Sequence, residues 1–239
     1  MPEPLISGNY LLYEQESPWG YVLTKDPVPF TIHSTQTDPA IAEVIMANNP
    51  QKGIIKVEKV GRMLTGVSVS DTAFGKQYTP IFSLVGLKGA TFEVKAAEDI
   101  YTPDGTLRYS KGQVVDTITT DANGYAESKQ LYLGHYIVTE TKAPPEFVLD
   151  PTPHDALLTY AGQEVAVTST QIGIGNTRQT VEIDLQKLME KPVNAPEGFD
   201  PFKDVIFGLY ADVDIKAVDG TIVIAKDSPI ALMQVGSTG

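Results

Sequence analysis

The sequence predicts an all-β protein built from tandem Ig-like β-sandwiches. Short runs rich in Val, Ile, Thr and Tyr alternate between apolar and polar residues, and turn signals such as "TPDGT", "TDANGY" and "VDGT" separate them. The best helix candidate, "DPAIAEVIMANN", also reads as a strand. An internal repeat provides the third observation, and it sets the number of sandwiches.

The repeat consists of three blocks that recur in the same order. Segment 7–23 matches segment 133–149 at an offset of 126 residues, which aligns Tyr10 with Tyr136. The first-strand lysine recurs at an offset of 128, and the "TFEV…DGT…K" block (91–111) recurs as "IFGL…DGT…K" (206–226) at an offset of 115. The repeats are out of phase with the chain ends. We therefore expect a complete domain at 51–179, the back half of a domain at 1–50, and the front half of another at 180–239.

Composition excludes several classes of function. The net charge of −12 argues against binding to nucleic acid or an anionic membrane surface. The chain has no cysteine, which excludes disulfides and thiol chemistry, and no run as long as a membrane span. No signal peptide or sorting motif reveals a mode of anchoring. The three histidines lack metal-ligand spacing, so neither a metal nor another cofactor is expected.

Polar side chains share faces with apolar ones at equivalent places in each unit. In "GIIKVEKVG" (53–61), Lys59 shares a face with Ile55 and Val57. A buried unpaired ammonium is costly, so such a lysine needs a partner or must lose its charge. The same parity argument places one Lys, one Glu and one Asn in each interior. These are Lys59, Glu140 and Asn176 in the complete domain and Lys187, Glu14 and Asn48 across the two halves, with Asn49 as the alternative to Asn48.

Those three residue types suit an intramolecular isopeptide bond. A desolvated lysine amine is a nucleophile and can attack the side-chain amide carbon of asparagine. A carboxyl in an apolar pocket can hydrogen-bond the amide and transfer protons as ammonia leaves. The product is a neutral amide, which removes the buried charge.

The segments "GIIKVEKVG", "LKGATFEVK", "TDANGYAESKQLYLGHYIVTETKAPPEFVLD" and "IGIGNTR" resemble the Cna B-type (SpaA-like, prealbumin-like) domains. The most specific block is "Y-x-x-x-E-T-x-A-P", beginning at Tyr136. Such domains build stalks and pilin shafts on Gram-positive bacteria. The resemblance implies a bond between Lys59 and Asn176 with Glu140 as catalyst, and a location outside the cell, at its surface or wall. The chain departs from the family in the 62–83 region, where an insertion replaces a short turn.

We therefore expect a structural stalk segment that acts on no outside substrate. Its expected partners are other copies of the chain or neighbouring repeats, joined head to tail into covalent filaments. In such a filament Lys187 of one chain would bond Asn48 of the next, with Glu14 as catalyst; pairing of the two halves within one chain is the alternative. Three other interpretations remain open: a surface role for Lys59, an adhesin whose insertion binds a host matrix protein or glycan, and an enzyme.

Overall fold

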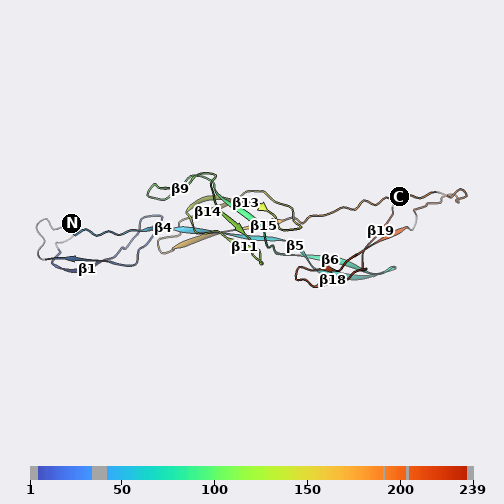
Figure 1. Ribbon diagram of the computed structural model, residues 1–239, viewed down its shortest axis with the longest axis horizontal. Helices are drawn as coiled ribbons and strands as arrows, with labels where there is room; N and C mark the ends of the chain where they lie inside the picture. Colours follow the sequence, from blue (N-terminus) through green and yellow to red (C-terminus); the bar gives the residue numbers. More distant parts are fainter. Residues whose placement is uncertain (1–4, 34–41, 191, 203–204, 236–239) are drawn as a thin grey trace. The chain divides into compact units, whose positions relative to one another are not determined.

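The computed structural model describes residues 5–33, 42–190, 192–202 and 205–235, and all of its regular elements are strands (Figure 1). None of the described residues forms a helix that could cross a membrane. The all-β prediction is confirmed. The strands are β1 Gly8–Leu12, β2 Tyr21–Val22, β3 Val28–Ile32, β4 Asn49–Pro50, β5 Lys52–Thr72, β6 Gly75–Gly86, β7 Thr91–Ala96, β8 Ile100–Tyr101, β9 Leu107–Tyr109, β10 Val114–Thr119, β11 Tyr125–Glu127, β12 Leu131–Tyr132, β13 Gly134–Lys142, β14 His154–Leu158, β15 Val167–Asn176, β16 Ile206–Tyr210, β17 Ile215–Lys216, β18 Ile222–Ile224 and β19 Pro229–Gln234.

The chain divides into two compact units. The first comprises Met1–Lys59, Leu87–Pro144 and Leu149–Ile174, and the second comprises Val60–Gly86, Pro145–Val148 and Gly175–Gly239. The units follow proximity in space, whereas the predicted domains follow the repeat, so their boundaries differ.

The core of the first unit lies between two sheets. One sheet has the strand order β10-β7-β13-β14, and in the other β5 pairs with β11, β12 and β15. Buried and half-buried residues alternate along the first part of β5, so every second side chain enters the core. Side chains of both sheets meet in one buried cluster that includes Ile55, Phe92, Tyr136, Val138 and Ile174. Burial of this apolar surface is the main stabilising term of the sandwich.

The N-terminal segment of the first unit repeats the pairing of β13 with β14. Tyr10 faces Phe30 in the β1–β3 pair, and Tyr136 faces Ala156 in the β13–β14 pair. Both partners are displaced by 126 residues. The hydroxyls of the two tyrosines also donate to the carbonyl four residues earlier, at 2.7 Å and 2.6 Å. The sequence repeat is thus also a repeat of hydrogen bonding.

The second unit contains the same kind of copy at an offset of 115. Phe207 faces Met233 in the β16–β19 pair, and Phe92 faces Ile118 in the β7–β10 pair. Both pairs shift register at equivalent positions. The turns before β10 and β19 also agree, because each contains one residue with a left-handed backbone. That residue is Gly112 in one copy, with φ 79°, and Asp227 in the other, with φ 63°.

The 62–83 insertion forms the outer part of a long hairpin. β5 continues for 21 residues and β6 for 12, and the two pair from Val60–Gly86 to Thr72–Gly75. Within the second unit β6 packs against β19. The Val218 amide donates to the Leu64 carbonyl at 2.9 Å. The insertion therefore takes part in packing the C-terminal segment.

Two predicted strands are absent. The prediction of a strand at "TVEIDLQKL" is wrong, because residues 180–190 form no regular structure. Val181, Ile183 and Leu185 are 90%, 59% and 45% exposed. The equivalent part of β5 is held by β11, β12 and β15, all of which come from the back of the repeat. Residues 42–48 form no strand either, although their inward and outward positions alternate as predicted. The helix candidate at 38–49 lies partly outside the described residues.

Candidate functional site

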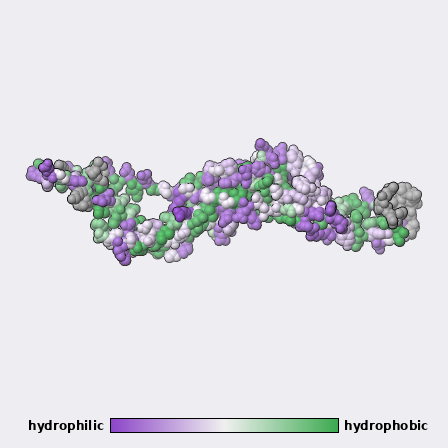
Figure 2. All heavy atoms as spheres, turned by 180° about the vertical axis from the view of Figure 1, so that it is seen from behind, coloured by the Kyte–Doolittle hydropathy of each residue, from purple (hydrophilic) through white to green (hydrophobic). Residues whose placement is uncertain are grey.

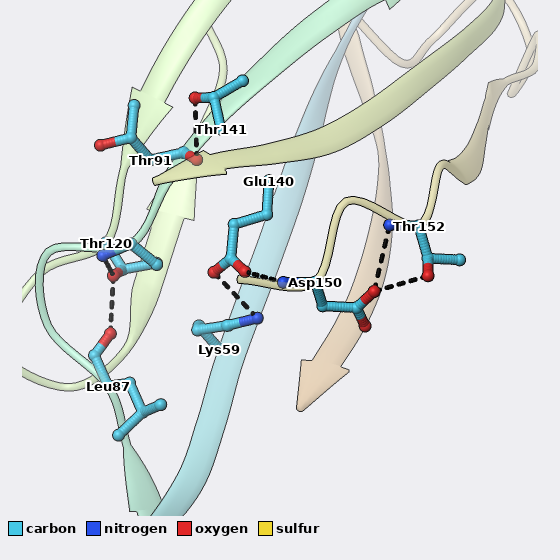
Figure 3. A network of polar contacts seen from close by, with 9 residues as sticks. Lys59, Leu87, Thr91, Thr120, Glu140, Thr141, Asp150 and Thr152 are labelled. Carbon is cyan, nitrogen blue, oxygen red and sulfur yellow. Dashed lines mark hydrogen bonds and ion pairs between the residues drawn. The ribbon is translucent and has the colours of Figure 1, made fainter. Parts of the chain in front are cut away.

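A buried ion pair occupies the end of the sandwich core. Lys59 lies near the end of the buried part of β5, and its Nζ lies 3.1 Å from Oε1 of Glu140 on β13 (Figure 3). Both side chains are fully buried, at 0% exposure. The side chain of Lys56, three residues earlier, is 43% exposed and pairs with Glu127 at 3.3 Å. Lys59 is therefore not a surface lysine, whereas Lys56 is.

The second oxygen of Glu140 binds the backbone. Oε2 accepts a hydrogen bond from the Asp150 amide at 3.0 Å, while Oε1 faces the lysine, as Figure 3 shows. Two different groups thus hold the carboxyl in one orientation. Glu140 is not a solvated charge at the end of a strand.

Burial makes the Lys59 amine easier to deprotonate. It lowers the pKa of Lys59 from its ordinary value of 10.5, because the ammonium loses its water; Glu140 and Asp150 oppose the shift by attraction. The amine also lies 5.5 Å from the centre of the Phe92 ring. Sequence reasoning did not assign that phenylalanine a part in the site, although its recurrence in "TFEV" and "IFGL" was a usable signal.

Asn176 is the last residue of β15, the strand that pairs with β5. It is buried, at 8% exposure, so it is not an exposed turn residue. At the neighbouring position, a Cβ built on Gly175 would lie 3.9 Å from the Val60 carbonyl oxygen.

The N-terminal segment contains a second carboxyl–amide pair. The side-chain amide of Asn48 donates to Glu14 Oε2 at 2.6 Å, and the Thr24 amide donates to the same oxygen at 2.8 Å. Thr24 follows Glu14 by ten residues, as Asp150 follows Glu140. Asn49 is exposed and belongs to β4. The geometry thus joins Glu14 to Asn48. Lys187, the lysine of the predicted second set, is half-buried and outside any strand.

Trp19 packs on Tyr160, with ring centres 5.5 Å apart, and is still 69% exposed. Together with Pro50, Tyr101 and Pro103 it lines a cavity of about 250 Å³.

No group of His, Cys, Asp or Glu residues in the described part of the chain could hold a metal ion.

The lowered pKa of Lys59 predicts a pH dependence in a chain that cannot cross-link. In an Asn176→Ala variant, the folded protein loses the Lys59 proton at a lower pH than the unfolded protein does. Between the lowered pKa and 10.5, the unfolded chain binds more protons, so the free energy of unfolding should rise with pH. Denaturant titrations up to about pH 9, a unit below the ordinary tyrosine pKa of 10.0 at which the unfolded tyrosines are half ionised, would measure this slope.

A double variant that also carries Lys59→Met is the control for this titration. It should lose the rise, because the titrating amine is gone. An equal slope in both variants would contradict the assignment to Lys59.

Comparison with known proteins identifies the middle of the chain. Residues 85–172 match the SpaA family model, described as a prealbumin-like fold domain. This stretch is therefore similar to a SpaA prealbumin-like domain, in agreement with the resemblance found in the sequence. A comparison with curated proteins found no match.

Solved structures with similar chains include three from Gram-positive bacteria. The Bacillus anthracis TIE protein is 20% identical with a TM-score of 0.41, over 72% of this chain and 26% of that chain. A D312A form of BcpA, the major pilin subunit of Bacillus cereus, is 22% identical with a TM-score of 0.31, over 54% and 30%. The full-length major pilin SpaD of Corynebacterium diphtheriae is 21% identical with a TM-score of 0.34, over 54% and 30%. The chain thus spans less than a third of the length of each of these proteins.

Proposed function

We propose that this chain, whose residues 85–172 match the SpaA prealbumin-like domain, is a segment of a load-bearing stalk or pilus shaft. It would lie outside the cell, at the surface or wall of a Gram-positive bacterium, and join copies or neighbouring repeats head to tail. The observation that carries the proposal is the fully buried Lys59–Glu140 pair. A buried ion pair is weak support for stability, because desolvation offsets much of its attraction. A role in a chemical reaction would explain why this ion pair is buried.

The reaction is a self-directed, single-turnover amide exchange. Lys59 passes a proton to Glu140, and the neutral Nζ attacks Cγ of Asn176. The new bond joins Nζ to Cγ, the Cγ–Nδ2 bond breaks, and Glu140 returns protons so that Nδ2 leaves as ammonia. The fold supplies the effective concentration of the two groups.

Strand pairing supports the choice of Asn176 as the acceptor. β5 pairs with β15, and Gly175 comes near Val60. Alternation then directs Lys59 and Asn176 to the opposite face from those two residues, which is the buried face. Both residues are buried, in agreement with this orientation.

The bond would make the domain resistant to pulling. It would join the first strand of the sandwich to the last and enclose nearly the whole domain. Closing a loop of roughly 100 residues contributes about 4 to 5 kcal/mol in the chain-entropy model, and an amide is not reducible. The hairpin insertion has a packing role in the second unit, which an adhesin loop would not need.

Intact-protein mass spectrometry tests the proposal. The folded chain should be lighter than its sequence by one ammonia, and tryptic fragments around Lys59 and Asn176 should remain joined. Glu140→Gln should fold, because burial drives the sandwich, but keep its full mass.

Glu127→Gln is the matched control, since it removes an exposed carboxylate that pairs with a lysine of the same strand. It should lose ammonia as the unaltered chain does. Full loss of ammonia in Glu140→Gln, or none in the unaltered chain, would overturn the proposed reaction.

A further inference from the structure

We propose that Glu14 and Asn48 form half of a second cross-linking site, which is completed by Lys187 of another copy of this chain. The inference rests on the isopeptide chemistry proposed above and assigns it a site between molecules. Its three residues are equivalent to Glu140, Asn176 and Lys59.

The acceptor half of this site is already assembled. Glu14 Oε2 binds the Asn48 amide at 2.6 Å and the Thr24 amide at 2.8 Å. In the complete domain the equivalent carboxyl binds the equivalent backbone amide at 3.0 Å and faces a lysine with its other oxygen. The carboxyl and the amide carbon are therefore held together in the N-terminal segment. A lysine from a first strand is the remaining member of the set.

Two segments of this chain form no strand, although the corresponding segments of the complete domain are strands that pair with each other. Residues 42–48 correspond to the end of β15, and residues 180–188 correspond to the buried part of β5. In the complete domain these two strands are hydrogen-bonded neighbours. In the half domains neither segment belongs to a strand. Pairing 180–188 of one copy with 42–48 of another would restore the missing ladder and bring Lys187 to Asn48.

The exposure of apolar side chains also favours a second copy of this chain as the partner. Val138 and Val94 are 0% exposed in the complete domain, whereas their equivalents Leu12 and Leu209 are 43% and 36% exposed. Ile183, the equivalent of fully buried Ile55, is 59% exposed. Figure 2 shows green hydrophobic surface among the purple hydrophilic surface on the face that it draws. Each half domain thus exposes the positions that the other half covers in the complete sandwich.

The chemistry balances as it does in the complete domain. Nζ of Lys187 would pass one proton to Glu14 and attack Cγ of Asn48, and Nδ2 would leave as ammonia. Each junction joins two different ends, so the contact is heterologous and generates open filaments unless the rotation closes a ring.

Two single variants test the junction when they are mixed. Lys187→Ala keeps the acceptor half, and Asn48→Ala keeps the lysine. Each variant alone should run as a monomer on a denaturing gel after boiling, whereas the unaltered 239-residue chain at high concentration should give a ladder of multimers. An equimolar mixture of the two variants should give a covalent dimer and nothing larger, because both free ends of that dimer are disabled.

Asn49→Ala and Lys216→Ala are the matched controls, and both should keep the ladder. Lys59→Ala separates this proposal from the previous one, because it should remove the bond within each domain and leave the ladder. No dimer in the mixture would overturn the inference. A monomer of the unaltered chain that has lost two ammonia molecules would also overturn it, because the halves would then close within one chain.

Discussion

Replacing Lys59 with methionine is expected to lower the thermal and chemical stability of the middle domain sharply. The substitution leaves Glu140 buried without its cationic partner, and breaking a buried pair on one side typically costs about 3 to 5 kcal/mol. In a chain that has formed the proposed cross-link, Lys59 is a neutral amide, so the loss is instead the ~4 to 5 kcal/mol of loop-closure stabilisation. Either loss is large, and denaturant unfolding of the variant and of the unaltered chain measures it.

Lys56→Met is the control on the same strand. Its ammonium is exposed and pairs with an exposed carboxylate, so the free energy of unfolding should change by no more than about 0.5 kcal/mol. If the Lys59→Met and Lys56→Met variants unfold at the same denaturant concentration, the buried Lys59 side chain contributes no more to the free energy of unfolding than the exposed one, which contradicts this prediction.

Phe92→Ala is expected to have the second large effect. The ring is fully buried in the core, and deleting a buried phenylalanine side chain costs about 3 to 5 kcal/mol. The ring also lies beside the Lys59 amine, so its loss should admit water and reduce the yield of the bond. Denaturant unfolding and intact mass measure the two effects.

Phe207→Ala is the matched variant, because Phe207 occupies the equivalent position in the C-terminal half. Phe207 is only half-buried in the single chain, so its removal there should cost about 1 kcal/mol or less. In covalent multimers the same substitution should cost more, since the ring would then be covered. A loss equal to that of Phe92→Ala in the single chain would contradict this comparison.

Much of the site in the complete domain follows from strand parity. Alternation along "GIIKVEKVG" predicted that Lys59 would point inward with Ile55 and Val57, and all three are 0% exposed. The same argument predicted the burial of Glu140 and Asn176. The hydrogen bond from the Asp150 backbone amide to Glu140 was not predicted. Asp150 lies in a loop, and strand parity says nothing about the path of a loop. The shared ten-residue spacing to Thr24 and Asp150 was the available signal.

In the two segments predicted to be half domains, strand parity was not sufficient to predict the structure. The pattern around Lys187 is as regular as that around Lys59, yet residues 180–190 form no strand. A strand becomes regular when neighbouring strands satisfy its backbone groups, and the sequence of one segment does not say whether those neighbours are present. The long hairpin formed by the 62–83 insertion could not be predicted for a different reason. The apolar alternation weakens after Lys59, whereas the backbone of β5 continues to Thr72 because β6 pairs with it.

The distance along the chain between Lys59 and Glu140 has a kinetic consequence. The two residues lie on strands that are far apart in the sequence, so their contact needs a long loop to close, and such non-local contacts form slowly. A chain that collapses with the wrong strand order would keep a hydrated lysine at its ordinary pKa and would not react. Bond formation would then occur only in correctly folded molecules. The cross-linked fraction after synthesis would therefore report the proportion of chains that reached the native strand order before any protease acted on them.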